Sequence, residues 1–154
     1  MDYDLETIED AKKTFTIALP KSWNTNLYVN EIQSSIFSAD NTKQLTETVL
    51  LDVTYINKTI EFNDDFLLKQ QQENLSKQLI QVQSKKFTFK ENPIVLMQFK
   101  GKKGRFNYQV CNSFIKLNSS NFILAKVEVY GDSLVNERFC SALQFIENIK
   151  LKQN

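Results

Sequence analysis

The sequence predicts an α+β domain in which helices pack on an antiparallel β-sheet. Segments that alternate apolar and polar residues, typical of half-buried strands, lie on both sides of a segment with helical spacing. Two of the later strand segments are followed by loops of about four residues, and such short loops join antiparallel neighbours. The 154 residues match the length of one domain.

The first half of the chain contains four predicted strands. Residues 14–19 alternate, with Phe15, Ile17 and Leu19 on one face, and Pro20 ends this strand. The other three are predicted at residues 27–30, 33–39 and 48–55, with a turn at residues 40–42.

A helix is predicted over residues 64–82. Asn63 supplies an N-cap, and Asp64 and Asp65 place negative charge in the first turn. One apolar stripe at helical spacing comprises Leu68, Leu75, Leu79 and Val82.

The second half predicts an antiparallel meander and a closing helix. Strands are expected at residues 86–91, 94–100, 105–117 and 122–130, with loops at 101–104 and 118–121 and a bulge near 111–113. In the last strand Ile123, Ala125, Val127 and Val129 face the core, and Phe122, Leu124 and Tyr130 indicate partial cover on the other face. Residues 131–133 end the sheet and cap the closing helix, whose stripe comprises Val135, Phe139, Ala142, Leu143, Ile146 and Ile149.

Charge divides the chain into two parts. Residues 1–12 form an expected flexible or weakly helical acidic lead-in, and residues 13–154 form the single domain. The first ten residues contain five acids and no base: Asp2, Asp4, Glu6, Glu9 and Asp10. Between residues 85 and 105 lie seven basic residues and one acid.

Composition argues against most enzyme classes. The chain has 0 His, which removes Ser-His-Asp and Cys-His catalysis and histidine metal sites. With 3 Gly it has no glycine-rich phosphate loop. No catalytic residue, cofactor site or metal site is predicted. Asp52, which alternation places opposite Val53, is read as a carboxylate facing solvent or a helix edge.

The two cysteines are predicted to be small buried hydrophobic residues. Cys111 lies in a strand, and Cys140 lies beside the apolar stripe of the closing helix. A disulfide between them requires that helix to lie over that strand.

The basic loop after the second meander strand is the candidate partner site. It comprises Lys100, Lys102, Lys103, Arg105 and Tyr108. Such a patch binds an acidic partner, or else it is a solvated loop. The expected partner is another protein; nucleic acid is not expected because the net charge is +1 and no nucleic-acid motif accompanies the patch.

No apolar run in the sequence reaches the length of a membrane span. The acidic start lacks the pattern of a secretory signal, so the chain as written is expected to be cytoplasmic. If a signal has been removed, an envelope lipoprotein is the alternative. Two cysteines do not decide the compartment.

The opening strand and Trp23 resemble the start of the PsbP/Mog-like family, which includes the photosystem II subunit PsbP, the Ran-binding Mog factor, DcrB-type lipoproteins and Eag chaperones. Residues 33–39 and 51–55, together with Tyr130-Gly-Asp132 and the apolar residues of 145–151, are similar to uncharacterised bacterial members. The resemblance covers residues 13–151 and implies an α/β/α sandwich. It also implies a binding, assembly or chaperone role, and it transfers no catalytic residue.

Three hypotheses follow. The leading one is a non-enzymatic binding or accessory protein that uses the basic loop. The second is a chaperone that shelters an apolar segment of a secreted effector, as Eag proteins do, and it predicts an exposed concave apolar face on the sheet. The third is an enzyme with carboxylate or lysine chemistry, which requires a pocket of converging acids such as Asp52.

Overall fold

The computed structural model describes residues 4–40 and 44–152. One antiparallel sheet contains, in spatial order, β3 (Asn24–Val29), β4 (Gln33–Ala39), β5 (Val49–Ile56), β9 (Phe122–Tyr130), β8 (Phe106–Lys116), β7 (Asn92–Lys103) and β6 (Ile80–Phe89). A smaller sheet places β2 (Phe15–Pro20) between β1 (Leu5–Glu9) and β10 (Lys150–Leu151). A 3₁₀ turn, η1 (Leu45–Glu47), precedes β5.

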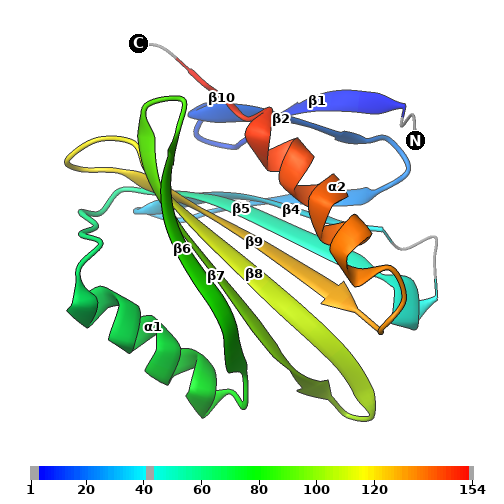
Figure 1. The fold of residues 1–154 in the computed structure, drawn as a ribbon. Coiled ribbons are helices and arrows are strands. Elements are labelled where there is room, and N and C mark those ends of the chain that lie inside the picture. Colours follow the sequence, from blue (N-terminus) through cyan, green and yellow to red (C-terminus); the bar gives the residue numbers. More distant parts are fainter. Residues whose placement is uncertain (1–3, 41–43, 153–154) are drawn as a thin grey trace.

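The elements form the predicted α+β architecture, with α/β/α layers (Figure 1). Helix α1 (Asp64–Ser76) packs on one face of the seven-stranded sheet through Phe66 and Leu67. Helix α2 (Val135–Glu147) and the small sheet cover the other face. The main core lies between the large sheet on one side and α2 with the small sheet on the other. It includes Phe15, Ile17, Leu19, Leu51, Val53, Val127, Phe139 and Ala142.

Strands β5 and β9 join the two halves of the chain at the centre of the large sheet. Val53 pairs with Ala125, and both side chains are completely buried. The prediction for β9 is confirmed on both faces: Ile123, Ala125, Val127 and Val129 lie in the main core, while Phe122, Leu124 and Tyr130 pack on the α1 side.

Residues 5–9 form the strand β1 and not a part of the predicted flexible or weakly helical lead-in. All five residues of β1 pair with β2, from Leu5 opposite Pro20 to Glu9 opposite Thr16. The polar residues of β1 are compatible with a strand because this strand is largely exposed. Pairing with an apolar neighbour therefore overrides the local composition.

Helix α1 is shorter than predicted. Asn63 caps it as expected, accepting a hydrogen bond of 2.8 Å from the backbone N–H of Phe66. The helix ends at Ser76, and Gln78 adopts a positive φ of 63° that turns the chain into β6. The predicted stripe is wrong, since Leu68 and Leu75 are exposed and Val82 belongs to β6.

The meander is confirmed, but three of its predicted details are wrong. Its first strand is Ile80–Phe89 and not residues 86–91, because Lys90 and Glu91 form the turn to β7. Residues 101–103 belong to β7, so the turn to β8 contains Gly104 and Arg105. No bulge interrupts β8, whose pairs with β7 and β9 run unbroken through Cys111, Asn112 and Ser113. Apolar residues occupy both faces of β8 because both faces are covered; the register shift lies instead between Gln81 and Gln83 in β6.

The stripe of α2 is confirmed by the burial of Phe139, Ala142 and Ile146. The N-cap residue is Leu134, with a φ of 52° and no side-chain hydrogen bond, so Ser133 does not cap the helix as expected. Of the turn predicted at residues 40–42, positions 41 and 42 lie outside the described residues.

Candidate functional site

An apolar groove lies on the α2 side of the large sheet, where α2 does not cover β6, β7 and β8. Its cavity volume is about 720 Å³. One wall is the sheet and the other is the end of α2 with the segment that follows it. The lining is mostly aliphatic and aromatic: Phe87, Phe89, Ile94, Leu96, Ile115, Leu117, Ile123, Leu143, Ile146, Ile149 and Leu151.

The sheet wall of the apolar groove is built by register. Phe87 of β6 pairs with Ile94 of β7, Ile94 pairs with Ile115 of β8, and Ile115 pairs with Ile123 of β9. Directly paired residues project from the same face, so these four side chains form one row across four strands. The row passes from the buried Ile123 to Phe87, which is 43% exposed.

The opposite wall depends on how α2 ends. The helix stops at Glu147, and the backbone N–H of Ile149 then donates to the carbonyl of Ile146 at 3.1 Å. This tight ending directs the chain into β10, which pairs with the edge of β2. Leu151, which is 44% exposed, therefore stands across the groove from the sheet.

The rim of the apolar groove carries three lysines and one glutamate: Lys90, Lys150, Lys152 and Glu147. The ammonium of Lys90 donates to the backbone carbonyl of Glu147 at 3.1 Å, which links the β6–β7 turn to the end of α2. Lys152 forms an ion pair of 2.7 Å with Glu9 of β1. The rim thus has positive character around an apolar interior, an arrangement that suits an amphipathic ligand.

Beyond the apolar groove the same face of the sheet becomes polar. Gln83 donates to Gln98 and Gln98 donates to Gln109, each at 2.6 Å. Past this glutamine ladder lie Lys100 and Lys102, both exposed and on the same face by alternation. The open face therefore runs from apolar to amide to cationic along the strands.

The residues of the predicted basic site are divided between the two faces of the sheet. Lys103 pairs with Phe106 and Gly101 with Tyr108, which places Lys103 and Tyr108 on the α1 side, opposite Lys100 and Lys102. The Arg105 guanidinium lies 6.0 Å from the ring of Phe106 at the tip of the hairpin. These five residues are therefore divided between the two faces of the sheet and the hairpin tip.

Lys103 is engaged within the protein. Its ammonium donates to the hydroxyl of Tyr130 at 3.0 Å and lies 5.3 Å from the ring centre of Tyr108. The rings of Tyr108 and Tyr130 are stacked at 5.4 Å, and Tyr130 donates to Glu128 at 3.1 Å. The hydrogen bond to Tyr130 raises the pKa of Lys103, while burial raises the pKa of both tyrosines. Tyr108 is thus part of the buried cluster on the α1 side of the sheet, and Lys103 packs against that cluster.

The two cysteines differ in environment. Cys111 is buried as predicted, and burial raises the pKa of its thiol to about 12. Cys140 is exposed, contrary to prediction, because its position on α2 turns away from the stripe. Both are free thiols.

Asp52 does not stand among converging acids. It accepts a hydrogen bond of 2.8 Å from Thr54 and is paired in register with Lys126. A small hollow of about 130 Å³ beside it is lined by Phe37, Leu50, Lys126 and Glu128. In residues 4–40 and 44–152 no group of three or more carboxylates and thiols is placed to hold a metal ion.

The apolar groove was not predicted as a site from the sequence. Its lining comes from segments that are distant in the chain, and only the register brings Phe87 beside Ile94 and Ile115. One feature of the sequence does point toward it: Phe87 and Phe89 alternate with polar residues in a strand that also contains Lys85 and Lys86. Large apolar side chains on so polar a strand indicate an exposed apolar face.

The fold is shared with solved structures. The chain matches the cyanobacterial PsbP of Synechocystis (CyanoP) with a TM-score of 0.65, at 10% identity over 99% of this chain and 95% of that one. It matches the Ran-binding protein Mog1p of Saccharomyces cerevisiae with a TM-score of 0.61, at 8% identity over 97% and 96%. The chain has the PsbP/Mog-like fold.

A crystal structure from Bacteroides thetaiotaomicron also shares this fold, with a TM-score of 0.60 and 10% identity. The match covers 100% of this chain but 50% of the Bacteroides chain, so the present chain spans half of that protein. No family model matches the sequence, and no curated protein matches it. Within the described part of the chain, no helix is both long and apolar enough to cross a membrane.

Proposed function

We propose that the chain is a non-enzymatic binding or accessory protein that holds an apolar segment of a partner protein in the apolar groove. The groove carries the proposal: a row of paired apolar side chains faces Leu151 and Ile149 across an open cavity of about 720 Å³. An exposed apolar surface of this kind, with a polar and charged rim, is typical of a recognition site.

Two further observations support a binding role. The chaperone hypothesis requires an open apolar face on the sheet, and the apolar groove is open between β6 and the end of α2. The Mog1p structure with the same fold is that of a Ran-binding protein, so this fold is used for protein recognition. Catalysis is not part of the proposal because fold alone does not define a reaction.

The predicted basic site enters this proposal in part. Lys100 and Lys102 lie on the same face as the apolar groove, beyond the glutamine ladder. A partner whose apolar segment fills the groove would carry acidic residues over this cationic end. Lys103, Arg105 and Tyr108 lie on the other face or at the hairpin tip and take no part in it.

The test uses a fluorescein-labelled ten-residue peptide that alternates Leu and Ser, with binding followed by fluorescence anisotropy. Phe87→Glu and Leu151→Glu each place a charge in the groove at a half-exposed position, so each should weaken peptide binding by about tenfold or more. Leu68→Glu is the matched control, because Leu68 is 52% exposed on α1 at the opposite face.

Two results would overturn the proposal. One is that Leu68→Glu weakens peptide binding as much as Phe87→Glu and Leu151→Glu do, while the melting temperatures of all three variants stay unchanged. The other is that the unmodified protein binds a fluorescent long-chain fatty acid in the groove and does not bind the peptide. The ligand would then be a lipid and not a protein segment.

A further inference from the structure

We infer that the partner segment binds in extended form, as an additional antiparallel or parallel strand on the free edge of β6, and that it is acidic as well as apolar. The inference rests on the proposed function and specifies how the segment lies and what chemistry it carries. Its apolar side chains would enter the apolar groove while its backbone pairs with β6.

Strand β6 ends the large sheet within the described chain, where it pairs with β7 alone. Its register with β7 is regular from Gln83 to Phe89, because the shift lies between Gln81 and Gln83. Alternate N–H and C=O groups of this stretch therefore point outward along an edge that can accept a further strand. In Figure 1 this strand forms the margin of the large sheet, with the β6–β7 turn near β10.

The edge and the apolar groove are parts of one surface. Lys85, Phe87 and Phe89 share the groove face of β6, since they pair with Leu96, Ile94 and Asn92 of β7. A strand added to β6 would project every second side chain to this same face. Those side chains would lie beside Phe87 and extend the apolar row that runs through Ile94 and Ile115.

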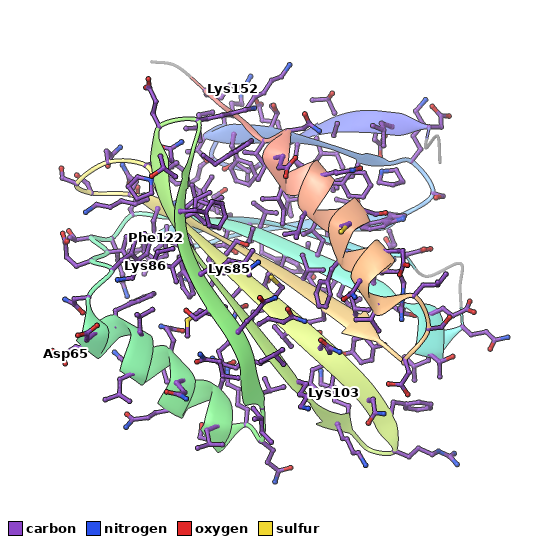
Figure 2. All side chains as sticks on the ribbon, in the orientation of Figure 1. Asp65, Lys85, Lys86, Lys103, Phe122 and Lys152 are labelled. Atoms are coloured by element: carbon purple, nitrogen blue, oxygen red, sulfur yellow. The ribbon has the colours of Figure 1, made fainter. Side chains whose placement is uncertain are left out.

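The charges of β6 select the partner. Residues 80–89 contain Lys85 and Lys86 and no acidic residue. Figure 2 labels both lysines on this strand, and neither forms an ion pair among the described residues. Lys86 donates to the backbone carbonyl of Phe62 at 3.1 Å, which is a neutral acceptor. When the apolar side chains of an added strand enter the apolar groove beside Lys85 and Phe87, glutamates at its alternate positions project to the opposite face, where Lys86 lies.

The same charges oppose pairing of β6 with a second copy of the chain. Antiparallel pairing of two β6 strands centred near Lys85 would bring Lys85 and Lys86 of one copy close to those of the other. Like charges in this arrangement are destabilising, whereas an acidic strand is attracted. The charges of the β6 edge therefore disfavour pairing with β6 of a second copy and favour pairing with a strand of opposite charge.

The first test measures pairing through the backbone. The probe is a labelled ten-residue peptide that alternates Val and Glu, compared with two versions methylated on the backbone nitrogen of every Val or of every Glu. In a strand these two sets of N–H groups point to opposite edges. Methylation of one set should lower affinity by at least about tenfold, and methylation of the other set should change it little. Equal tolerance of both would overturn the inference.

A second measurement is hydrogen exchange of the β6 amides, followed by NMR. In the free protein, alternate amides from residue 83 to residue 89 should exchange quickly because their N–H groups face solvent. Saturating Val–Glu peptide should protect them. Unchanged exchange in bound protein would also overturn the inference.

The charge requirement is tested with Lys86→Glu, on the face that receives the glutamates of the Val–Glu peptide, which should lower affinity for that peptide roughly fivefold and raise affinity for a Val–Lys peptide. Lys13→Glu in the exposed β1–β2 turn makes the same charge change away from the groove and should leave both affinities unchanged. Preference for the Val–Lys peptide in the unmodified protein would contradict an acidic partner. Loss of binding in Phe87→Glu with tolerance of both methylations would leave the proposed function standing and remove only the added strand.

Discussion

The hydroxyl of Ser34 donates a hydrogen bond of 2.5 Å to the carboxylate of Asp10, and this contact joins the small sheet to the large one. Asp10 also accepts from the backbone N–H groups of Thr14 and Phe15, at 2.7 and 2.9 Å, and from the hydroxyl of Thr14 at 2.6 Å. One buried carboxylate thus holds the β1–β2 turn and anchors it on β4.

Replacing Asp10 with Asn should destabilise the protein by about 2 kcal/mol at pH 7, since several hydrogen bonds to a charged group are weakened. Burial favours the protonated acid, but the hydrogen bonds from Ser34, Thr14 and Phe15 outweigh it and lower the pKa below 3.8. The contribution is therefore complete above about pH 4 and is lost as the pH falls through the folded-state pKa. Urea denaturation at pH 7 and near pH 2 should show the difference between Asp10→Asn and the unmodified protein shrinking in acid. Glu6→Gln, on exposed β1, is the control and should cost little.

Gly131→Ala should cost at least about 3 kcal/mol, because Gly131 has a φ of +81° and an added Cβ would lie 1.9 Å from the carbonyl oxygen of Thr46. Gly104→Ala is the matched comparison. Gly104 also has a positive φ, of +60°, but nothing lies within 4 Å of an added Cβ, so its cost should be about 1 kcal/mol. Thermal unfolding of the two variants separates backbone strain from steric overlap, and equal losses would contradict this assignment.

The β6–β7 turn should be improved by Glu91→Gly. Lys90 and Glu91 have φ values of 51° and 70°, the left-handed conformations of a type I′ turn, for which glycine is preferred at the second position. The substitution should stabilise the protein by roughly 1 kcal/mol. Chemical denaturation measures it, with Glu137→Gly in α2 as a contrast that should destabilise by a similar amount. A loss of stability in Glu91→Gly would show that the turn is not strained.

Cys140 should react with a thiol reagent such as DTNB at pH 8, and Cys111 should not react until the protein unfolds. Cys140 is exposed, whereas Cys111 is buried with a pKa raised to about 12 and has almost no thiolate at this pH. The expected stoichiometry is one thiol per native chain and two in denaturant. Cys140→Ser should abolish the fast reaction, and a persistent fast reaction in that variant would place Cys111 within reach of solvent.

Much of the fold could be predicted because alternation and helical spacing are local properties. The local pattern of apolar residues predicts the strands near residues 15–20, 33–39 and 49–56, and it also predicts the apolar stripe of α2. The error at residues 77–82 has a physical cause. Leu79 is buried against the α1 side of the sheet although it lies in neither α1 nor β6, so one apolar residue at helical spacing does not decide between helix and strand.

The strand β1 and the apolar groove could not be predicted in the same way. The polar sequence of β1 becomes a strand because β2 offers it a free edge, and Asp10 becomes a buried anchor because Ser34 lies opposite. The distribution of the basic residues could not be predicted either, because alternation sends Lys102 and Lys103 to opposite faces once residues 101–103 are a strand and not a loop. The resemblance to the PsbP/Mog-like family, by contrast, rests on the order of the elements along the chain, and the local alternation of apolar residues is enough to predict that order.

The central pairing of β5 with β9 has a consequence for how the chain folds. Strands β3 to β5 form one antiparallel unit of neighbours in sequence, and β6 to β9 form another. The seam between them pairs Val49 with Val129, so it cannot form until most of the chain has been synthesised and the second unit exists. We therefore expect the docking of two locally formed units to limit the folding rate, and a nick in the exposed connection at residues 57–59 to leave two fragments able to reassemble.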